Sequence, residues 1–314
     1  MMIIDSHLHC FPWIKGIRDG NAETRGDRLG VVRRVEKGTS TEERYLPPSF
    51  YEVSSLPEVA LAYMQDAGVN KAILMQAPCY GNHNEFVSEI VGRWPDKFIG
   101  MGLVDPRRRV QTVVKEIRHI VSNLDLRGIK FEVPDTPFYP GEDKYLPMWE
   151  KINEQGVPAV IDLGWGEGEY YFQLEGIRRV LSRVQGLRIV LAHLGVSRLW
   201  DPQEEYPFPT LQKTLSLAEE FPNVMFDIAG LTNATAHMGT ADEEFPFSRM
   251  QKAIQATYQR VGADRIMWGS DYPSVLLSCT YKQVVKIITD HCDFLGPREK
   301  ERIMGKNAQQ VFGF

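Results

Sequence analysis

Short apolar runs recur along the chain and alternate with longer segments in which apolar residues recur at every third or fourth position. Runs of this length predict buried strands, and the three-to-four spacing predicts amphipathic helices. The clearest helical stripe consists of Val110, Val113, Ile117 and Val121, and residues 251–261 repeat the pattern. The eight predicted strands comprise residues 3–9, 71–76, 98–104, 126–132, 157–163, 188–194, 224–229 and 265–269.

Alternation of strands and helices predicts parallel strands, because a parallel pair needs a long crossover connection. Eight such repeats in 314 residues predict an α/β fold of the (β/α)8 TIM barrel type, with residues 1–314 forming a single domain. In that fold the active site lies at the carboxyl ends of the strands. Polar residues at those ends are therefore the candidates for chemistry.

Residues 10–56 interrupt the alternation. They are rich in charge and glycine and end near Pro47 and Pro48, which predicts a long loop insertion after the first strand. Loops of this length are usually functional or disordered. Two interpretations stay open, a lid over the catalytic end of the barrel and a solvated surface insertion. A helical tail from Arg298 is expected to cover the outside of the barrel.

The first predicted strand ends in two histidines. Side chains alternate along a strand, so Asp5, His7 and His9 are expected on one face, and Ser6 and Leu8 on the other. Two neighbouring imidazoles can converge on a metal ion or on a substrate oxygen. The alternative is a pair of structural histidines with satisfied hydrogen bonds.

Two other predicted strands also end in groups that can do chemistry. His193 ends the sixth strand, and Asp271 follows the eighth just before Pro273. A buried carboxylate without a partner costs several kcal/mol, so Asp271 should face a cation, a metal ion or hydrogen-bond donors. The alternative is a loop aspartate that caps the next turn. Together with the two histidines of the first strand, these residues predict one cluster at the barrel mouth.

The charge balance narrows the range of partners. Lys and Arg number 36 against 41 Asp and Glu, a net charge of −5, which argues against nucleic acid and anionic membrane as partners. No secretion signal and no membrane-spanning apolar run is apparent, so a cytoplasmic location is expected. The four cysteines lack the spacing of a disulfide framework or a zinc site, so reduced thiols are expected. Homo-oligomer formation stays open.

Four motifs in chain order carry a family resemblance: DSHLH near the start, LAHLG, GSDYP, and GKNAQQVF near the end. Together they resemble the amidohydrolase superfamily, specifically its amidohydrolase-related branch. That branch includes zinc-dependent decarboxylases such as aminocarboxymuconate-semialdehyde decarboxylase and resorcylate decarboxylase. It also includes lactone hydrolases similar to pyrone dicarboxylate lactonase. The resemblance implies a TIM barrel of the metal-dependent hydrolase type.

The resemblance also implies a ligand set. In the decarboxylases the metal is held by the counterparts of His7, His9 and Asp271 and by a strand-five histidine, while the counterpart of His193 assists catalysis. This chain has Asp162 in strand five. Carboxylate oxygen suits zinc or manganese, so the implied metal set is His7, His9, Asp162 and Asp271, with zinc preferred and manganese as the alternative. The pyrone-type lactonases, however, lack that histidine and work without metal.

Three cations are placed by the sequence where they could meet an anionic substrate: Arg33 and Arg34 in the insertion, and Lys130 in the fourth strand. Arginine suits bidentate binding of a carboxylate. Lys130 has two other interpretations. The resemblance allows a carboxylated lysine that bridges two metals, and the usual pairing of buried charges allows an ion pair with Glu132 or Asp162.

The expected protein is thus a metal-dependent hydrolase that acts on a small carboxylated ring or lactone. Asp271 would help the metal to activate water, and His193 would stabilise the developing oxyanion. The alternative is a metal-dependent nonoxidative decarboxylase, a carboxy-lyase for a hydroxylated aromatic or muconate-type acid. A third hypothesis is a barrel that only binds a ligand. The aromatic residues Tyr80, Trp165 and His237 are expected to line the substrate pocket or to pack at its rim.

Overall fold

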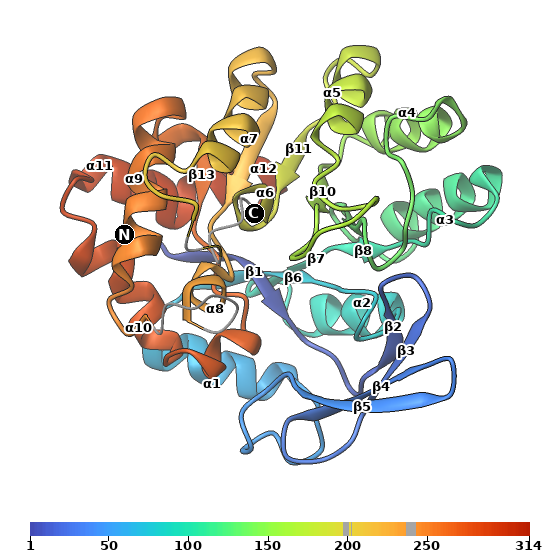
Figure 1. Ribbon diagram of the computed structural model, residues 1–314, viewed down its shortest axis with the longest axis horizontal. Helices are drawn as coiled ribbons and strands as arrows, with labels where there is room; N and C mark the ends of the chain where they lie inside the picture. The colour runs from blue at the N-terminus through green and yellow to red at the C-terminus, as the bar shows by residue number, and fades with distance from the viewer. Residues whose placement is uncertain (197–200, 202, 237–242) are drawn as a thin grey trace.

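The computed structural model describes residues 1–196, 201, 203–236 and 243–314. Figure 1 shows the parallel strands at the centre, most helices in an outer ring, and a small separate sheet at one side. The architecture is the predicted (β/α)8 barrel.

The predicted strands are confirmed, and the third is divided in two. Hydrogen bonds join neighbouring strands in parallel in the orders β1-β6-β7 and β8-β9-β10-β11-β12-β13. Met101 separates β7 from β8 and donates its N–H to the carbonyl of Leu74 at 2.9 Å. The strands are β1 (Ile4–His9), β6 (Lys71–Met75), β7 (Phe98–Gly100), β8 (Gly102–Leu103), β9 (Ile129–Glu132), β10 (Ala159–Asp162), β11 (Ile189–Leu191), β12 (Val224–Asp227) and β13 (Ile266–Met267).

Helices follow the strands and turn one apolar stripe toward them. The predicted stripe at residues 110–121 lies on α3, where Val113, Ile117 and Ile120 are buried, and residues 251–261 belong to α9. The helices are α1 (Pro57–Ala67), α2 (Asn84–Arg93), α3 (Val110–Ser122), α4 (Leu146–Glu154), α5 (Leu174–Arg183), α6 (His193–Val196), α7 (Pro209–Glu220), α8 (Leu231–Ala236), α9 (Ser248–Val261), α10 (Tyr281–Lys286), α11 (Pro297–Glu301) and α12 (Asn307–Phe312).

The carboxyl-terminal tail is helical, as expected, and its first part covers the outside of the barrel, where Ile303 and Met304 pack in the same apolar cluster as Trp268. Ala308, Val311 and Phe312 of α12 pack on Ile4 and on other side chains that fill the barrel interior. Arg188, just before β11, donates a hydrogen bond to the carbonyl of Val311 at 2.8 Å. The last helix therefore also closes the amino-terminal end of the barrel, which leaves the opposite end for the active site.

The expected insertion after β1 is present, and it folds as a small sheet rather than as a loop. It forms an antiparallel meander in the order β2-β3-β4-β5. One face packs on a small apolar cluster that includes Ile14, Val32 and Leu46, whereas β5 is exposed along its whole length. Because the outer face is so polar, the strand pattern is masked in the sequence. The strands are β2 (Lys15–Arg18), β3 (Ala22–Gly26), β4 (Val31–Glu36) and β5 (Thr39–Arg44).

Strand β2 docks on the loop that follows β6 at the carboxyl end of the barrel. Lys15 N–H donates to the carbonyl of Tyr80 at 3.0 Å, and Ile17 N–H donates to that of Pro78 at 2.9 Å. The hydroxyl of Thr24 donates to the carbonyl of Cys79 at 2.5 Å. These contacts make the meander a fixed wall beside the barrel mouth.

Close backbone approach at Gly16 should be essential for this docking. A Cβ at Gly16 would lie 2.0 Å from the carbonyl oxygen of Pro78, so Gly16→Val should displace β2. We expect the amides of Lys15 and Ile17 to exchange with deuterium at least about 10-fold faster in the variant. Gly92→Ala, where an added Cβ meets nothing within 4 Å, is the control. Unchanged protection in Gly16→Val would mean that β2 is not held as described.

Candidate active site

A bulge in β1 decides which of its side chains reach the barrel mouth. Asp5 pairs with Ala72 and Leu8 with Leu74, so β1 has one extra residue between these pairs. Asp5 therefore does not share a face with His7, as a regular strand would require. Its carboxylate accepts hydrogen bonds from the hydroxyls of Ser270 and Tyr281 at 2.5 and 2.7 Å instead. The bulge leaves the histidines of β1 facing the mouth.

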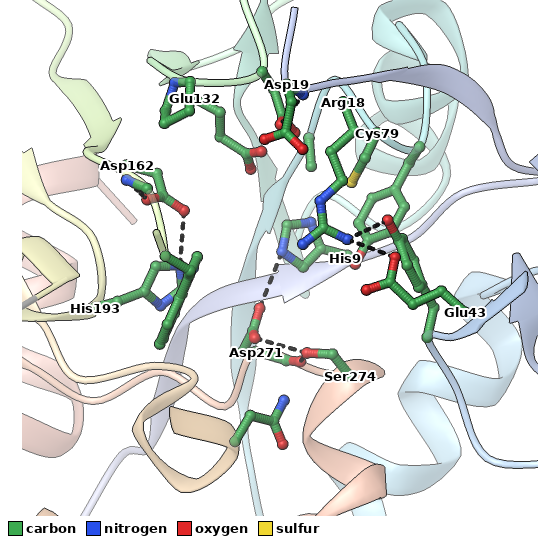
Figure 2. Close-up of a pocket in the computed structure, with 18 of the residues that line it drawn as sticks. His9, Arg18, Asp19, Glu43, Cys79, Glu132, Asp162, His193, Asp271 and Ser274 are labelled. Atoms are coloured by element: carbon green, nitrogen blue, oxygen red, sulfur yellow. Dashed lines mark hydrogen bonds and ion pairs between the residues drawn. The ribbon is translucent and has the colours of Figure 1, made fainter. Parts of the chain in front are cut away.

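A cavity of about 470 Å³ lies at the carboxyl ends of the strands. Figure 2 shows that side chains of the barrel strands and of the insertion surround it. Its ionisable lining residues include His7, His9, Arg18, Asp19, Glu43, Arg44, Tyr45, Cys79, Tyr80, Glu132, Asp135, Asp162, Tyr171, His193 and Asp271.

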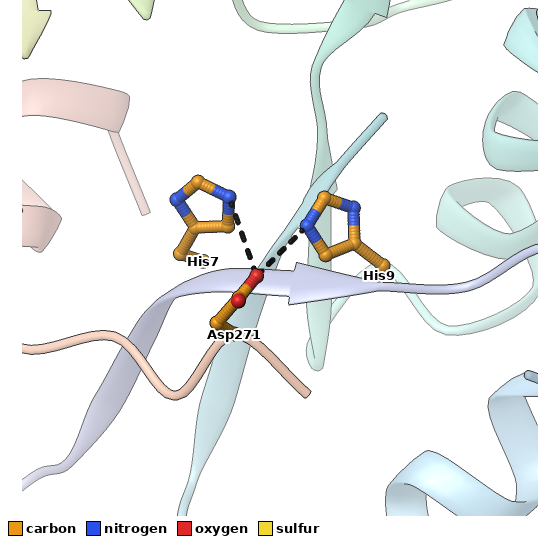
Figure 3. Close-up of side chains that lie close together, drawn as sticks. All are labelled: His7, His9 and Asp271. Atoms are coloured by element: carbon orange, nitrogen blue, oxygen red, sulfur yellow. Dashed lines mark ion pairs between the residues drawn. The ribbon is translucent and has the colours of Figure 1, made fainter. Parts of the chain in front are cut away.

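Two imidazoles and one carboxylate converge on the floor of the cavity (Figure 3). Asp271 Oδ1 lies 3.3 Å from His9 Nε2 and 4.0 Å from His7 Nε2. The other ring nitrogens face acceptors, because His7 Nδ1 lies 2.9 Å from Asp227 Oδ2 and His9 Nδ1 lies 3.1 Å from the carbonyl of Met75. Both Nδ1 atoms therefore carry the proton, and in a neutral ring the Nε2 lone pair faces the Asp271 carboxylate.

This donor set fits a divalent ion. Lone pairs that face one another across 3.3 Å need a proton or a cation between them. Catalytic zinc sites use three protein ligands drawn from nitrogen and oxygen donors, and their histidines donate the second ring N–H to a carboxylate or carbonyl. His7, His9 and Asp271 have these features. Asp162 is not part of this group.

Asp227, at the end of β12, orients two histidines and was not predicted. Besides the bond from His7, it accepts hydrogen bonds from the backbone N–H groups of His193 and Ala229, at 2.9 and 3.2 Å. The side chain is fully buried. Burial would raise the pKa of Asp227, but the charge and hydrogen bond of His7 lower it below the ordinary value. The signal was a carboxylate that ends an apolar strand.

His193 and Asp162 form a second pair at the cavity floor, with the His193 ring 4.7 Å from that of His7. His193 Nε2 lies 3.4 Å from Asp162 Oδ2, and His193 Nδ1 donates to the carbonyl of Ala229 at 2.8 Å. Burial would lower the pKa of His193, but its hydrogen bond to Asp162 and the charge of Asp162 raise it to about 9. In the protein without metal, pairing with Asp162 therefore favours the imidazolium form of His193 at neutral pH.

Asp271 remains ionised although it is buried. Burial would raise its pKa, but the neighbouring imidazole of His9 and the charge of His193 hold the pKa well below its usual range. The hydroxyl of Ser274 donates to Asp271 Oδ2 at 2.6 Å. The backbone N–H of Asp271 donates to the carbonyl of His7 at 2.8 Å, which fixes the carboxylate beside β1.

A family model described as amidohydrolase matches residues 4–314. The chain belongs to the amidohydrolase family. The similarity covers the whole barrel, so the family assignment that the four sequence motifs indicated is confirmed.

Solved structures of other amidohydrolases have the same fold. One from Burkholderia multivorans with bound zinc is 16% identical over 100% of both chains, with a TM-score of 0.71. A probable 2-pyrone-4,6-dicarboxylic acid hydrolase from Acinetobacter baumannii with bound citric acid is 17% identical over 100% of both chains, with a TM-score of 0.69. A 5-carboxyvanillate decarboxylase from Sphingomonas paucimobilis is 18% identical over 83% of this chain and 84% of that chain, with a TM-score of 0.59. Both hydrolases and decarboxylases are thus similar to this amidohydrolase in fold.

The predicted substrate arginines lie outside the cavity. Arg33 pairs with Asp27 at 2.8 Å, and Arg34 pairs with Asp19 at 2.9 Å. Both are on β4, whereas β2 is the strand that docks on the barrel, so their position as substrate ligands is corrected. The sequence did not reveal this register because the meander itself was not predicted. The arginines that do line the cavity, Arg18 of β2 and Arg44 of β5, were not predicted as substrate residues.

The other predicted pocket residues divide into three groups. The Trp165 ring lies 4.8 Å from that of His193, and the Tyr80 ring lies 5.2 Å from that of His9, so both line the cavity as predicted. Lys130 is fully buried beneath the cavity, with Nζ 3.8 Å from Glu132 Oε1. His237 lies outside the described residues.

Among the described helices, none is long and apolar enough to cross a membrane.

Loss of the Asp227 carboxylate should weaken metal binding, because the His7 ring would lose its charged acceptor. Changing such an outer partner typically costs about 10- to 100-fold in metal affinity. We expect Asp227→Asn to show a decrease in this range in chelator competition. The control is Asp264→Asn, at an exposed residue that pairs with Arg302. Equal metal affinity in wild type and Asp227→Asn would show that Asp227 does not support His7.

The pairing of His193 with Asp162 should make stability depend on pH. The folded-state pKa of His193, about 9, lies above its ordinary value of 6.5. Its stabilisation is therefore fully present below pH 6.5 and is lost as the pH rises through about 9. In urea unfolding of metal-free protein, Asp162→Asn should lower the free energy of unfolding by roughly 3 kcal/mol at pH 6.5 and by less above pH 9. A difference that does not change with pH would contradict the ion pair.

Proposed function

We propose that this amidohydrolase is a metal-dependent hydrolase that opens a small lactone or a carboxylated ring. The observation that carries the proposal is the presence of two neighbouring groups on the cavity floor. His7, His9 and Asp271 offer a ligand set, and His193, paired with Asp162, places a positive charge beside it, with its ring 4.7 Å from that of His7. Ester hydrolysis needs a base for water and positive charge near the developing oxyanion, and this floor offers both.

His7, His9 and Asp271 would hold the metal, with zinc preferred and manganese as the alternative. When bound, a divalent ion lowers the pKa of water toward about 7 and polarises a carbonyl group. Asp162 belonged to the set that the resemblance implied. Its Oδ2 lies 3.4 Å from His193 Nε2 and its Oδ1 accepts the Gly164 N–H at 2.7 Å, so we assign it to orienting His193 instead.

The chain's own residues would move the protons. Asp271 is ionised and can accept a proton from water at the cavity floor. The distance of 3.4 Å between His193 Nε2 and Asp162 Oδ2 is long for a hydrogen bond. A substrate oxygen can therefore replace Asp162 as the acceptor of the hydrogen bond from Nε2. His193 would then stabilise negative charge on that oxygen and could deliver its proton to the leaving alkoxide. Trp165, against the His193 ring, limits access of water from that side.

Decarboxylation is the alternative, and one observation favours it. An imidazolium next to the ligand set could also protonate a ring carbon before carbon dioxide leaves. We prefer hydrolysis because Asp162 replaces the histidine of the decarboxylase pattern. The added carboxylate makes the site more anionic, which weakens attraction for a substrate carboxylate at the metal.

Substitutions should separate metal binding from chemistry. His193→Asn should retain the metal and lower turnover roughly 100-fold or more, because it removes the positive charge but no ligand. Asp271→Asn should lose both the metal and activity. Elemental analysis and turnover of each variant are the measurements. Equal loss of metal in the two variants would place His193 among the ligands and refute this assignment.

Isotope labelling tests the reaction itself. A hydrolase incorporates one oxygen atom from solvent into its product, whereas a nonoxidative decarboxylase releases carbon dioxide and adds a solvent proton to carbon. Zinc-loaded protein would be incubated with a panel of lactones and hydroxylated aromatic acids in heavy-oxygen water. Mass spectrometry should show one labelled oxygen in a ring-opened product. Release of carbon dioxide without label in the organic product would favour the alternative.

A further inference from the structure

Both arginine and carboxylate side chains line the cavity. Two arginines line it, Arg18 and Arg44, and both come from the insertion. Arg44 donates a hydrogen bond to the carbonyl of Leu29 at 2.7 Å, within the insertion itself. The carboxylates that line the cavity are Asp19, Glu43, Glu132, Asp135, Asp162 and Asp271. An anionic substrate therefore has few places where its charge is favoured.

Arg18 is held in one position with donors to spare. Its Nη1 donates to the Tyr45 hydroxyl at 2.5 Å and to Glu43 Oε2 at 3.1 Å. Between described residues, the Arg18 guanidinium makes no other hydrogen bond, so its Nε–H and Nη2–H groups are available. Its side chain is 32% exposed. In Figure 2 the guanidinium lies on the side of the cavity opposite Asp162 and His193.

The backbone around Arg18 is fixed to the barrel. Ile17 N–H donates to the carbonyl of Pro78, and Asp19 N–H donates to Asp135 Oδ1 at 3.0 Å. Both neighbours of Arg18 are thus bonded to barrel loops. A guanidinium that is already ordered loses little entropy when it binds a carboxylate, and its planar fork suits two parallel hydrogen bonds.

We infer that Arg18 forms a subsite for one carboxylate of the substrate, placed across the cavity from His193. This inference deepens the proposed function, on which it rests, by naming the substrate class: a ring or lactone with a single carboxylate. Among the described residues, neither Glu132, whose Oε1 lies 3.8 Å from Lys130 Nζ, nor Asp135 pairs with an arginine, so that wall offers a second substrate carboxylate no guanidinium of its own. Dicarboxylated rings should be poorer ligands.

Binding of simple aromatic probes tests the subsite directly. Zinc-loaded protein would be titrated with benzoate, with benzamide as its uncharged counterpart, and with isophthalate as the dicarboxylate. We expect benzoate to bind at least about 10-fold more tightly than benzamide and no more weakly than isophthalate. Arg18→Met should remove the preference for benzoate. Arg33→Met, which removes a neighbouring arginine that does not line the cavity, should leave the preference unchanged.

A second variant keeps the inference testable if Arg18→Met does not fold. Glu43 competes for the Arg18 guanidinium, so Glu43→Gln should strengthen benzoate binding several-fold. Unchanged or weaker binding in Glu43→Gln would overturn the subsite. The subsite would also be overturned if the wild-type protein showed no preference for benzoate over benzamide. It would equally be overturned if Arg18→Met folded and kept that preference. Tighter binding of isophthalate than of benzoate would overturn the restriction to one carboxylate.

Failure of the subsite and failure of the proposed function are distinguishable. Turnover is measured separately with γ-butyrolactone-γ-carboxylate and its primary amide. If benzoate binding depends on Arg18 but neither lactone is opened, the proposed hydrolysis loses support and the subsite stands. If both lactones are opened equally well by wild type and Arg18→Met, hydrolysis stands and the subsite is overturned.

Discussion

The seam between the first and last parts of the barrel is the constraint on which the site depends. Ser6 N–H donates to the carbonyl of Trp268 at 3.0 Å, and Asp271 N–H donates to that of His7 at 2.8 Å. Asp5 of β1, whose side chain faces away from the cavity, accepts the N–H groups of His7 and Ser270 and so bonds to both sides of the seam. These bonds bring the histidines of β1 to the carboxylate that follows β13. Without them the ligand donors would have no common position.

Each histidine of the site has one ring nitrogen committed to a fixed acceptor. Asp227, the carbonyl of Met75 and the carbonyl of Ala229 supply these acceptors. The environments of His7 and His193 give these two histidines different pKa values. Burial lowers the pKa of His7 to about 4, with Asp227 partly opposing, whereas Asp162 raises the pKa of His193 to about 9. Two histidines of one cavity are thus suited to the two roles that we propose for them, a neutral ligand and a cationic acid.

The sequence predicted the barrel and most of the floor of its cavity, because both depend on local patterns. Apolar runs identify strands, and polar residues that end them lie at the barrel mouth, as His9, His193 and Asp271 do. The parts that it did not predict depend on register. Pairing between strands produces the bulge in β1 that turns the Asp5 side chain away from the cavity. It also produces the meander that brings Arg18, rather than Arg33, to the cavity. Asp227 carried the same strand-end signal as Asp162 but was not selected.

We propose that His7, His9 and Asp271 together hold one divalent ion, and X-ray absorption spectroscopy at the zinc edge of the loaded protein can count these ligands. We expect a shell of oxygen and nitrogen donors at about 2.0–2.1 Å that includes two imidazoles. His9→Gln should reduce the number of imidazoles to one, and His193→Asn should leave it at two. A shell with three imidazoles, or one that loses an imidazole in His193→Asn, would contradict the assignment.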